Sequence, residues 1–389
     1  MKLKGNASRI AMTVVPVIAF VLTSLYIPQA KDFFVQAKLA SVQLNMPIHA
    51  MENLKTDIAS NTGGENEQTT NATSEETESG EDKEENEADE VMKRTPGDAV
   101  TATPEDILKL QKQAEEAIKS EAKAGNITEE PYTGGGKIVN WGDIKVQSKI
   151  PEDFYQLNIE KLLSMNTDLS IEDKSKPTVL IYHSHTTEAY QMLDVGYYTA
   201  SFKQRCDDIA QNMVRVGDEI TAVLTKNGFN VIHDRQIYDK NYNASYGLSD
   251  VSIKKYLEQY PTIDVTIDVH RDAIEYKDGT KVKPVIEING KKAAKMMIIA
   301  GCEYGSIKNF PDWESNLRFD LQLQQKAEKM YPGLMRPILF SARRYNMFET
   351  PYSFLLEVGS DGNTLDEACY SGRLMGTVLS ELLNDYVKK

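Results

Sequence analysis

The sequence predicts an α/β domain, from about residue 145 to residue 389, built on a mostly parallel sheet with helices on both faces. Short β-branched runs alternate with amphipathic stretches of helical length throughout this region. Such alternation is typical of parallel strands joined by covering helices. Two of the runs, ending near His183 and His270, change abruptly from apolar to polar residues. Because ligands bind beyond the carboxyl ends of such strands, these ends predict a functional site.

The sequence predicts a membrane anchor near the N-terminus. The basic residues 1–9 precede an uncharged apolar run over residues 10–27, which is close to the minimum length for crossing a bilayer. The positive flank predicts that residues 1–9 stay in the cytoplasm and that the rest of the chain lies outside. A cleaved signal peptide is the alternative. Because the run is long for a signal core and residues 26–30 match a cleavage site poorly, we expect an uncleaved anchor.

A juxtamembrane segment (residues 28–60) and an acidic linker (residues 61–102) follow. The net charge of the chain is −14, and twelve acids and one lysine between Glu65 and Glu90 contribute −11 of it. A segment so charged and so poor in apolar residues predicts a disordered spacer, with an acidic docking tail as the alternative. The rest of the chain is therefore nearly neutral, and no basic stripe indicates nucleic-acid binding.

Residues 103–144 are expected to form a helix and a flexible joint. Thr103 and Pro104, followed by two acids, are typical of a helix start, and the helix is expected to reach Ala124. The glycines of residues 133–136 predict the joint. The sequence does not identify a partner for this helix.

The helices and strands of residues 145–389 are predicted from the spacing of apolar residues and from residues that end helices and strands. The helix over 208–227 gathers its apolar residues on one face and is followed by Gly228, the residue most common after a helix end. The expected strands are 178–182, 230–233, 263–269, 294–300, 338–340 and 354–358. The expected helices are 208–227, 249–259, 317–330 and 365–383.

His185, Glu188 and His270 form the candidate metal site. His185 and Glu188 have the spacing His-x-x-Glu directly after one strand, where a tight turn can aim both side chains at one point. His270 ends a second strand. Two imidazoles and a carboxylate leave the fourth position of a zinc ion open for water, which is a pattern of catalytic zinc sites. Zinc lowers the pKa of such a water to about 7 and polarises a carbonyl group under attack.

Glu357 and Arg271 complete the candidate catalytic set. Glu357 follows three apolar residues of the last predicted strand, where a carboxylate is costly unless it has a task or a partner. We assign it as the general base that passes a proton to the leaving nitrogen. Arg271 is assigned to a substrate carboxylate or to the developing oxyanion. Asp268 or Asp272, which flank His270, could orient an imidazole, and Asp272 could instead pair with Arg271.

The other histidines of the domain are expected to be structural. Adjacent strand positions alternate between the faces of a sheet, so His183 should point away from His185's site, either into the core or toward a hydrogen bond with a ligand. His233 is a lone histidine at a strand end.

At these residues the chain resembles the stage II sporulation protein P family of endospore-forming bacteria. The matching segments are residues 183–188, 216–217, 242–246, 269–272 and 357–359, within roughly residues 145–389. The resemblance implies a zinc-dependent N-acetylmuramoyl-L-alanine amidase that cuts the amide between the glycan lactyl group and the stem peptide, with an accompanying endopeptidase activity. It also implies septal wall thinning and forespore engulfment, with stage II sporulation proteins D and M as partners, at the septum between mother cell and forespore.

One departure keeps other functions open. The common zinc amidases take their glutamate ligand from the start of the helix after the first histidine strand. Here Asp207 and Asp208 come closest to that place, so Asp207 is the reserve ligand for Glu188. The His-x-x-Glu spacing instead resembles zinc carboxypeptidases. Two alternatives to the amidase therefore remain. One is a zinc carboxypeptidase acting on stem peptides, and the other is a non-catalytic wall-binding scaffold with an amidase fold.

Overall fold

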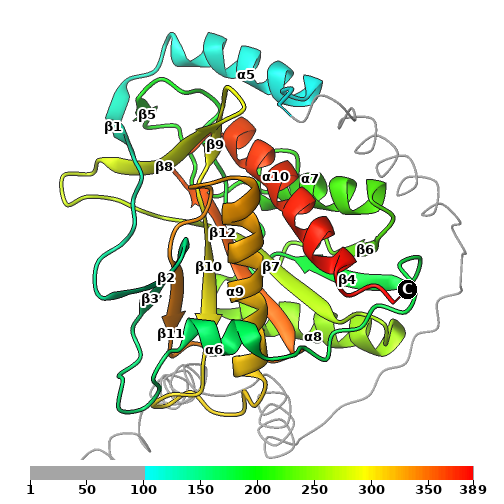
Figure 1. The fold of residues 1–389 in the computed structure, drawn as a ribbon. Coiled ribbons are helices and arrows are strands. Elements are labelled where there is room, and N and C mark those ends of the chain that lie inside the picture. Colours follow the sequence, from blue (N-terminus) through cyan, green and yellow to red (C-terminus); the bar gives the residue numbers. More distant parts are fainter. Residues whose placement is uncertain (1–100, 389) are drawn as a thin grey trace, which may run out of the picture. The chain divides into compact units, whose positions relative to one another are not determined.

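Two sheets and their covering helices make up the part of the chain that the structure, a computed structural model, describes, residues 101–388 (Figure 1). The predicted anchor over residues 10–27, the segment over 28–60 and the acidic stretch of the linker lie outside the described residues. No helix within residues 101–388 is both long and apolar enough to cross a membrane.

The larger sheet has eight strands in the order β2-β3-β11-β10-β12-β7-β4-β6. The pairs β2–β3 and β10–β12 are antiparallel, and the other neighbouring pairs are parallel. The sheet is therefore mixed, and most of its neighbouring pairs are parallel, as predicted. Its strands are β2 (Ile138–Trp141), β3 (Ile144–Ser148), β4 (Pro177–Tyr182), β6 (Asn230–His233), β7 (Val265–Asp272), β10 (Met296–Gly301), β11 (Ile338–Ser341) and β12 (Tyr352–Ser360).

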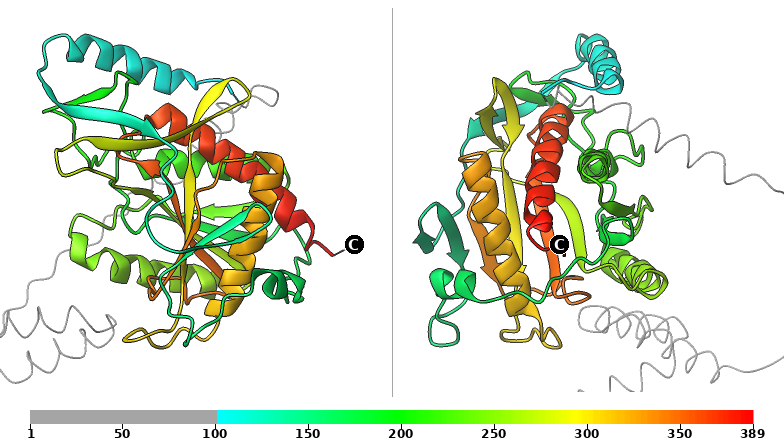
Figure 2. Two further views of the ribbon diagram at one scale, coloured as in Figure 1. Left: turned by 60° about the vertical axis from the view of Figure 1, so that its left-hand side comes forward. Right: turned by 45° about the vertical axis from the view of Figure 1, so that its right-hand side comes forward.

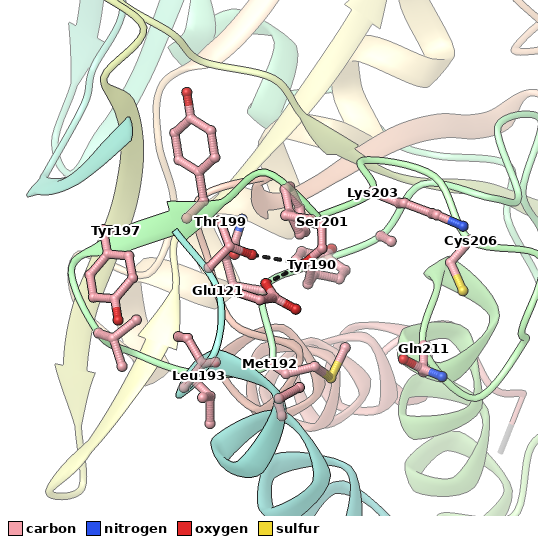
Figure 3. Close-up of a pocket in the computed structure, with 18 residues that line it drawn as sticks. Glu121, Tyr190, Met192, Leu193, Tyr197, Thr199, Ser201, Lys203, Cys206 and Gln211 are labelled. Carbon is pink, nitrogen blue, oxygen red and sulfur yellow. Dashed lines mark hydrogen bonds between the residues drawn. The ribbon is translucent and has the colours of Figure 1, made fainter. Parts of the chain in front are cut away.

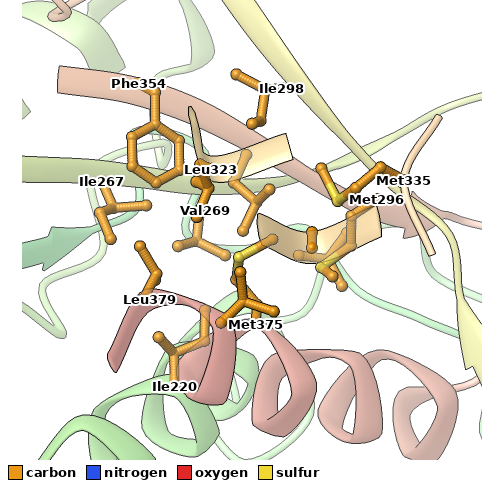
Figure 4. Close-up of a cluster of buried hydrophobic side chains, with 14 of the residues drawn as sticks. Ile220, Ile267, Val269, Met296, Ile298, Leu323, Met335, Phe354, Met375 and Leu379 are labelled. Atoms are coloured by element: carbon orange, nitrogen blue, oxygen red, sulfur yellow. The ribbon is translucent and has the colours of Figure 1, made fainter. Parts of the chain in front are cut away.

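Three helices cover one face of this sheet: α7 (Met213–Lys226), α9 (Trp313–Met330) and α10 (Leu365–Asn384). Figure 2 shows α9 and α10 side by side along the strands. Alternate residues of the central strands, such as Ile267 and Phe354, join Leu379 of α10 in the main apolar core (Figure 4). Burial of this face is the main force that holds these helices to the sheet.

The opposite face is covered by α8 (Ser245–Gln259) and by loops. Leu180 and Tyr182 of β4 pack with Ile253 of α8, whereas Met297 of β10 packs with Phe310 from a loop. Helices on both faces were predicted, and both faces are covered. Successive residues of β4, β7 and β12 thus divide between an α7/α10 face and an α8 face.

Local capping fixes the helix ends. The Asn212 side chain accepts a hydrogen bond from the backbone N–H of Val214, so α7 begins five residues later than predicted. Gly228 follows α7 with a φ of +85°, a backbone conformation that favours glycine. Thr364 and Glu367 form a reciprocal capping box at the start of α10. These contacts are local, which is why the sequence predicted most of these elements.

The sequence predicted a helix followed by a flexible joint over residues 103–144. In the structure these residues are instead part of the domain. Helix α5 (Glu105–Ile118) ends six residues early, because β1 (Lys123–Glu130) pairs with two strands of a second sheet. That sheet has the order β5-β1-β8-β9. Its remaining strands are β5 (Tyr197–Thr199), β8 (Lys281–Ile288) and β9 (Lys291–Ala294). Strand pairing between distant segments overrode the local helix preference. The predicted boundary at residue 145 is therefore wrong.

Candidate active site

Four of the five predicted site residues lie together at the carboxyl ends of β4, β7 and β12. Glu357 of β12 is the register partner of His270 of β7. The ring centroids of His185 and His270 are 5.3 Å apart, and Glu188 Oε2 lies 3.4 Å from His270 Nδ1. All four side chains are buried or nearly so. The two residues from the loop after β4 therefore meet the two strand residues at one point of the sheet edge.

The turn that carries His185 and Glu188 is held by hydrogen bonds. The Glu188 N–H donates to the carbonyl of His185. Thr186 Oγ1 donates to the carbonyl of His183, and Thr187 donates to the buried Asp239 through both its backbone N–H and its hydroxyl. These contacts explain why two threonines separate the histidine from the glutamate.

His270 lies between two carboxylates. Its Nε2 is 2.8 Å from Asp268 Oδ1, although out of line for a hydrogen bond, and its Nδ1 faces Glu188. Burial opposes a charge on His270, but Asp268 and Glu188 raise its pKa well above the ordinary value. Burial likewise opposes a charge on Glu188, but His270 and Arg271 lower its pKa to about 2. The site therefore stabilises positive charge between these groups.

His185 keeps one nitrogen free. Ser245 Oγ donates to the carbonyl of Tyr242, so it accepts from His185 Nδ1, 3.2 Å away. Neutral His185 then carries its lone pair on Nε2. Burial, with the nearby charge of His270, lowers the pKa of His185 to about 4, so the ring is neutral at pH 7.

Glu357 is a buried carboxyl group without a hydrogen bond to its Oε2 from any described residue. Burial, reinforced by Asp272, raises the pKa of Glu357 to about 8, although His270 acts in the opposite direction. Both protonation states are therefore accessible near neutral pH, which is the property that a group moving protons needs.

The donor set fits a zinc ion in its chemistry. His185 offers Nε2, while the other nitrogen of each imidazole faces a serine or an aspartate, as in metal sites whose histidines are oriented by a second partner. A cation could replace the proton that His270 shares with Glu188. As the side chains stand in residues 101–388, no three His, Cys, Asp or Glu groups are arranged to hold a metal ion. The reserve ligand Asp207 is exposed on the loop before α7, whereas Glu188 lies beside His270.

Arg271 holds the backbone around Glu188. Its Nε donates to the carbonyl of Ala189, and its Nη2 to the carbonyl of Gln204. Its backbone N–H donates to Glu188 Oε2. The guanidinium is buried and engaged, so this placement does not support the predicted contact with substrate. The Asp272 carboxylate pairs with Arg336, whereas Arg271 Nη1 donates to the backbone carbonyl of Asp272. Asp268 is the aspartate at His270.

His183 points to the α7 face and begins a chain of polar groups. Its Nδ1 donates to the carbonyl of Val269, and its Nε2 lies 2.9 Å from His233 Nε2. Since a carbonyl only accepts, neutral His183 accepts at Nε2 from His233, whose Nδ1 faces Asp218 at 3.1 Å. A Cβ on Gly217 would lie 2.5 Å from His233. His183 thus extends the ladder between β4 and β7 at the residue before His270.

Three tyrosines and an arginine at the site were not predicted. Tyr242 stacks on His185, Tyr246 lies beside the rings of both His185 and His270, and Tyr345 stacks on Tyr246. Arg205 lies over the Tyr242 ring. The signals in the sequence were the i, i+4 spacing of the first two tyrosines and the place of residues 242–246 among the segments that carry the family resemblance. Tyr345 comes from a loop whose position depends on the whole sheet.

A separate pocket of about 290 Å³ lies between α5 and the loop before α7 (Figure 3). Ala114 and Ile118 of α5 line it, together with Tyr190 and Phe202 of the loop. None of the predicted site residues lines this pocket. The candidate site is therefore a strand-end cluster distinct from it.

The fold and the cluster define a class of protein: an α/β domain with histidines and carboxylates gathered at the carboxyl edge of its sheet. A model of the family described as stage II sporulation protein P (SpoIIP) matches residues 27–380. The chain belongs to this family, as the sequence had predicted. The stage II sporulation protein P of Bacillus subtilis (strain 168) is 27% identical over 261 residues. That alignment covers 62% of this chain and 62% of the relative, so it spans less than two thirds of the relative's length.

Solved structures of amidases resemble part of the chain distantly. The CwlD amidase from Clostridioides difficile, in complex with the GerS lipoprotein, has a TM-score of 0.34 at 11% identity, covering 54% of this chain and 98% of that chain. The catalytic domain of CwlV from Bacillus (Paenibacillus) polymyxa var. colistinus has a TM-score of 0.32 at 13% identity, covering 54% and 97%. AmiC2 of Nostoc punctiforme has a TM-score of 0.32 at 10% identity, covering 54% and 96%.

Proposed function

We propose that the protein is a zinc-dependent N-acetylmuramoyl-L-alanine amidase, which cleaves the amide between the glycan and the stem peptide of peptidoglycan. One observation carries the proposal: the buried, unpartnered Glu357 stands in register opposite His270, beside His185 and Glu188. A proton carrier next to a set of zinc-type donors is the combination that metal-assisted amide hydrolysis requires. Membership of the stage II sporulation protein P family supports the same reaction.

His185, His270 and Glu188 would hold the zinc ion. When bound, zinc would supply a Lewis acid for the amide carbonyl and lower the pKa of water to about 7. Asp268 would orient His270 and Ser245 would orient His185, each by fixing the nitrogen that faces away from the ion. Arg271 would keep Glu188 in place through the carbonyls of Ala189 and Gln204 that it binds.

Glu357 would move the proton. Its raised pKa lets it accept a proton from water and later return that proton to the leaving nitrogen near pH 7. Amide nitrogen is a poor leaving group unless it is protonated, so this transfer is essential to bond cleavage. General acid–base catalysis of this kind contributes about 10²–10⁴ in rate.

The setting of the reaction belongs to the same proposal. We infer an anchor over residues 10–27 that places the domain outside the cytoplasmic membrane, at the sporulation septum. Wall thinning and engulfment would follow from the hydrolysis, with stage II sporulation proteins D and M as partners and with an accompanying endopeptidase activity. The family membership and the apolar run are the support for this setting.

Digestion of purified cell wall by the full-length protein tests the proposal. We expect release of stem peptides with a free L-alanine amino group, measured by mass spectrometry. Glu357→Gln should lower the rate by about 10²–10⁴, and His270→Ala or a zinc chelator should abolish it. Glu381→Gln, an exposed change on α10, is the control and should be fully active.

Other outcomes would replace the amidase. Loss of single C-terminal residues with the lactyl amide intact would identify a carboxypeptidase. Wall binding without turnover, together with no zinc in metal analysis, would identify a scaffold. Full activity of His270→Ala would remove the site assignment itself.

A further inference from the structure

We propose that two arginine–tyrosine pairs, Arg205–Tyr242 and Arg343–Tyr345, recognise carboxylates of an acidic stem peptide on either side of the reaction centre. This inference rests on the proposed function, because it names the part of the substrate that the same site reads. It starts from a continuous series of rings across the site. The rings of this column, in order, are Tyr345, Tyr246, His270 with His185, and Tyr242.

The ring column passes directly through the two histidines. The Tyr345 and Tyr246 rings stack at 4.8 Å between centroids. Tyr246 lies nearly parallel to His270 at 6.3 Å and meets His185 edge-on at 5.2 Å. His185 then stacks on Tyr242 at 4.3 Å, with an angle of 6° between the planes. The outer rings, Tyr345 and Tyr242, therefore lie on either side of the two histidines.

The first end of the column is open to solvent. Tyr242 is 56% exposed although its ring stacks on His185. The Arg205 guanidinium lies 4.9 Å from the centre of the same ring. Asp239 binds Nη1 of Arg205, and Nη2 lies 3.7 Å from Glu188 Oε1. Asp239 therefore fixes the guanidinium at the rim of the site, where its side chain is 38% exposed.

The second end carries a strained residue. Tyr345 has a φ of +42°, an uncommon conformation for a bulky side chain. Such strain persists where the surrounding structure enforces it, and it is common at ligand-binding positions. The exposed Arg343 donates to the Tyr345 hydroxyl and lies 5.6 Å from its ring centre. Burial raises the pKa of Tyr345, whereas the neighbouring Arg343 acts in the opposite direction.

Charge complementarity decides which substrate this arrangement fits. The carboxyl groups of Glu188, Asp268 and Glu357 lie at the centre of the site, whereas an arginine lies at each end of the column. Nη1 of Arg205 is bound by Asp239 and Nη1 of Arg343 by the Tyr345 hydroxyl, so the other N–H groups of each guanidinium remain as donors for a substrate carboxylate. The stacked tyrosine keeps each guanidinium pre-oriented, so less entropy is lost on binding. An acidic peptide lying along the column satisfies both ends.

The test measures binding of two matched ligands. The first is a disaccharide–peptide fragment of peptidoglycan with free carboxyl groups, and the second is the same fragment with its carboxyl groups converted to carboxamides. Calorimetry with the full-length Glu357→Gln protein gives affinities without turnover. We expect Arg205→Gln and Arg343→Gln each to weaken binding of the free acid about tenfold or more, and to leave binding of the carboxamide unchanged.

Arg344→Gln is the matched control, because Arg344 lies in the same loop but stacks on Phe348. It should not change either affinity. Equal losses for both ligands, or no loss for the free acid, would overturn the inference. If the protein with Glu357 intact hydrolyses cell wall but the free-acid fragment binds no more tightly than the carboxamide, the inference is overturned and the amidase proposal stands. If the free-acid fragment binds more tightly but cell wall is not hydrolysed, carboxylate recognition is supported and the amidase proposal is rejected.

Discussion

At the scale of single residues, two buried carboxyl groups without hydrogen-bond partners are the most informative features of residues 101–388. Glu357 lies among the charges of the site, whereas Asp320 of α9 is buried with both of its oxygens unpartnered. Burial raises the pKa of each. An unpaired buried carboxyl group destabilises the folded state. The proposed proton transfer gives Glu357 a function that offsets this cost, whereas Asp320 lies outside the site and has no role in the proposed reaction.

We predict that Asp320→Asn raises the stability of the protein relative to the wild type, increasingly so as the pH rises. An unfolded aspartate ionises near pH 4, whereas the folded state keeps Asp320 protonated, so wild-type stability falls as pH rises through this window. Asparagine does not titrate. Urea unfolding at pH 5 and pH 7 should show the stability difference growing by up to about 1.4 kcal/mol per pH unit. A constant difference would contradict burial of Asp320, and Asp153→Asn is the exposed control.

At the scale of secondary-structure elements, the site depends on how α7 approaches the ends of β4 and β6. Gly217 lets the helix backbone come against the His183 and His233 rings, where a Cβ would lie 2.7 Å and 2.5 Å from their Nε2 atoms. Asp218, the next residue of α7, pairs with His233. The helix therefore supports the histidine chain that ties β4 to β7 beside His270.

We predict that Gly217→Ala destabilises the protein by about 1–3 kcal/mol through overpacking. In an ordinary helix the same change would stabilise by up to about 1 kcal/mol, so the sign itself is diagnostic. Urea unfolding measures it, with Lys226→Ala at the exposed end of α7 as the control. A stabilised Gly217→Ala protein would mean that the helix is not pressed against the two rings.

At the scale of the described molecule, α5 is held to the main domain by buried charges. Arg215 of α7 is fully buried and pairs with Asp106 of α5 and with Glu219. Arg373 of α10 pairs with the same Glu219. Breaking a buried pair leaves a charge without compensation, which is costly. This network answers the question that the sequence left open, because α7 is a partner of the helix after the linker, and α10 is joined to the network through Glu219.

We predict that Asp106→Asn lowers the free energy of unfolding by about 1–3 kcal/mol, less than for a fully buried pair because Asp106 is 24% exposed. Hydrogen exchange should become faster in α5 before the rest of the domain. Glu116→Gln on the same helix is the control, since its pair with Lys119 is exposed and such pairs contribute little. Equal effects of the two variants would show that the charge network does not hold α5.

The fold was predictable where the signals are local. Strands β4 and β6 and helix α10 follow from β-branched runs and from caps such as Thr364. The β8–β9 hairpin was missed although its turn, Asn289-Gly290, has positive φ at both residues and is a strong hairpin signal. Strand β1 carries no such signal, because its pairing partners are distant in the sequence.

The sequence by itself determined the class of the fold, the family and the residues at the strand ends, because apolar periodicity and helix caps act over a few residues. Only the tertiary structure decided that Glu357 faces His270, that Arg271 is engaged by backbone carbonyls, and that the tyrosines form a column across the site. Those facts depend on strand register and on loops far apart in the chain. Register is set by how whole elements pack, and no short segment encodes it.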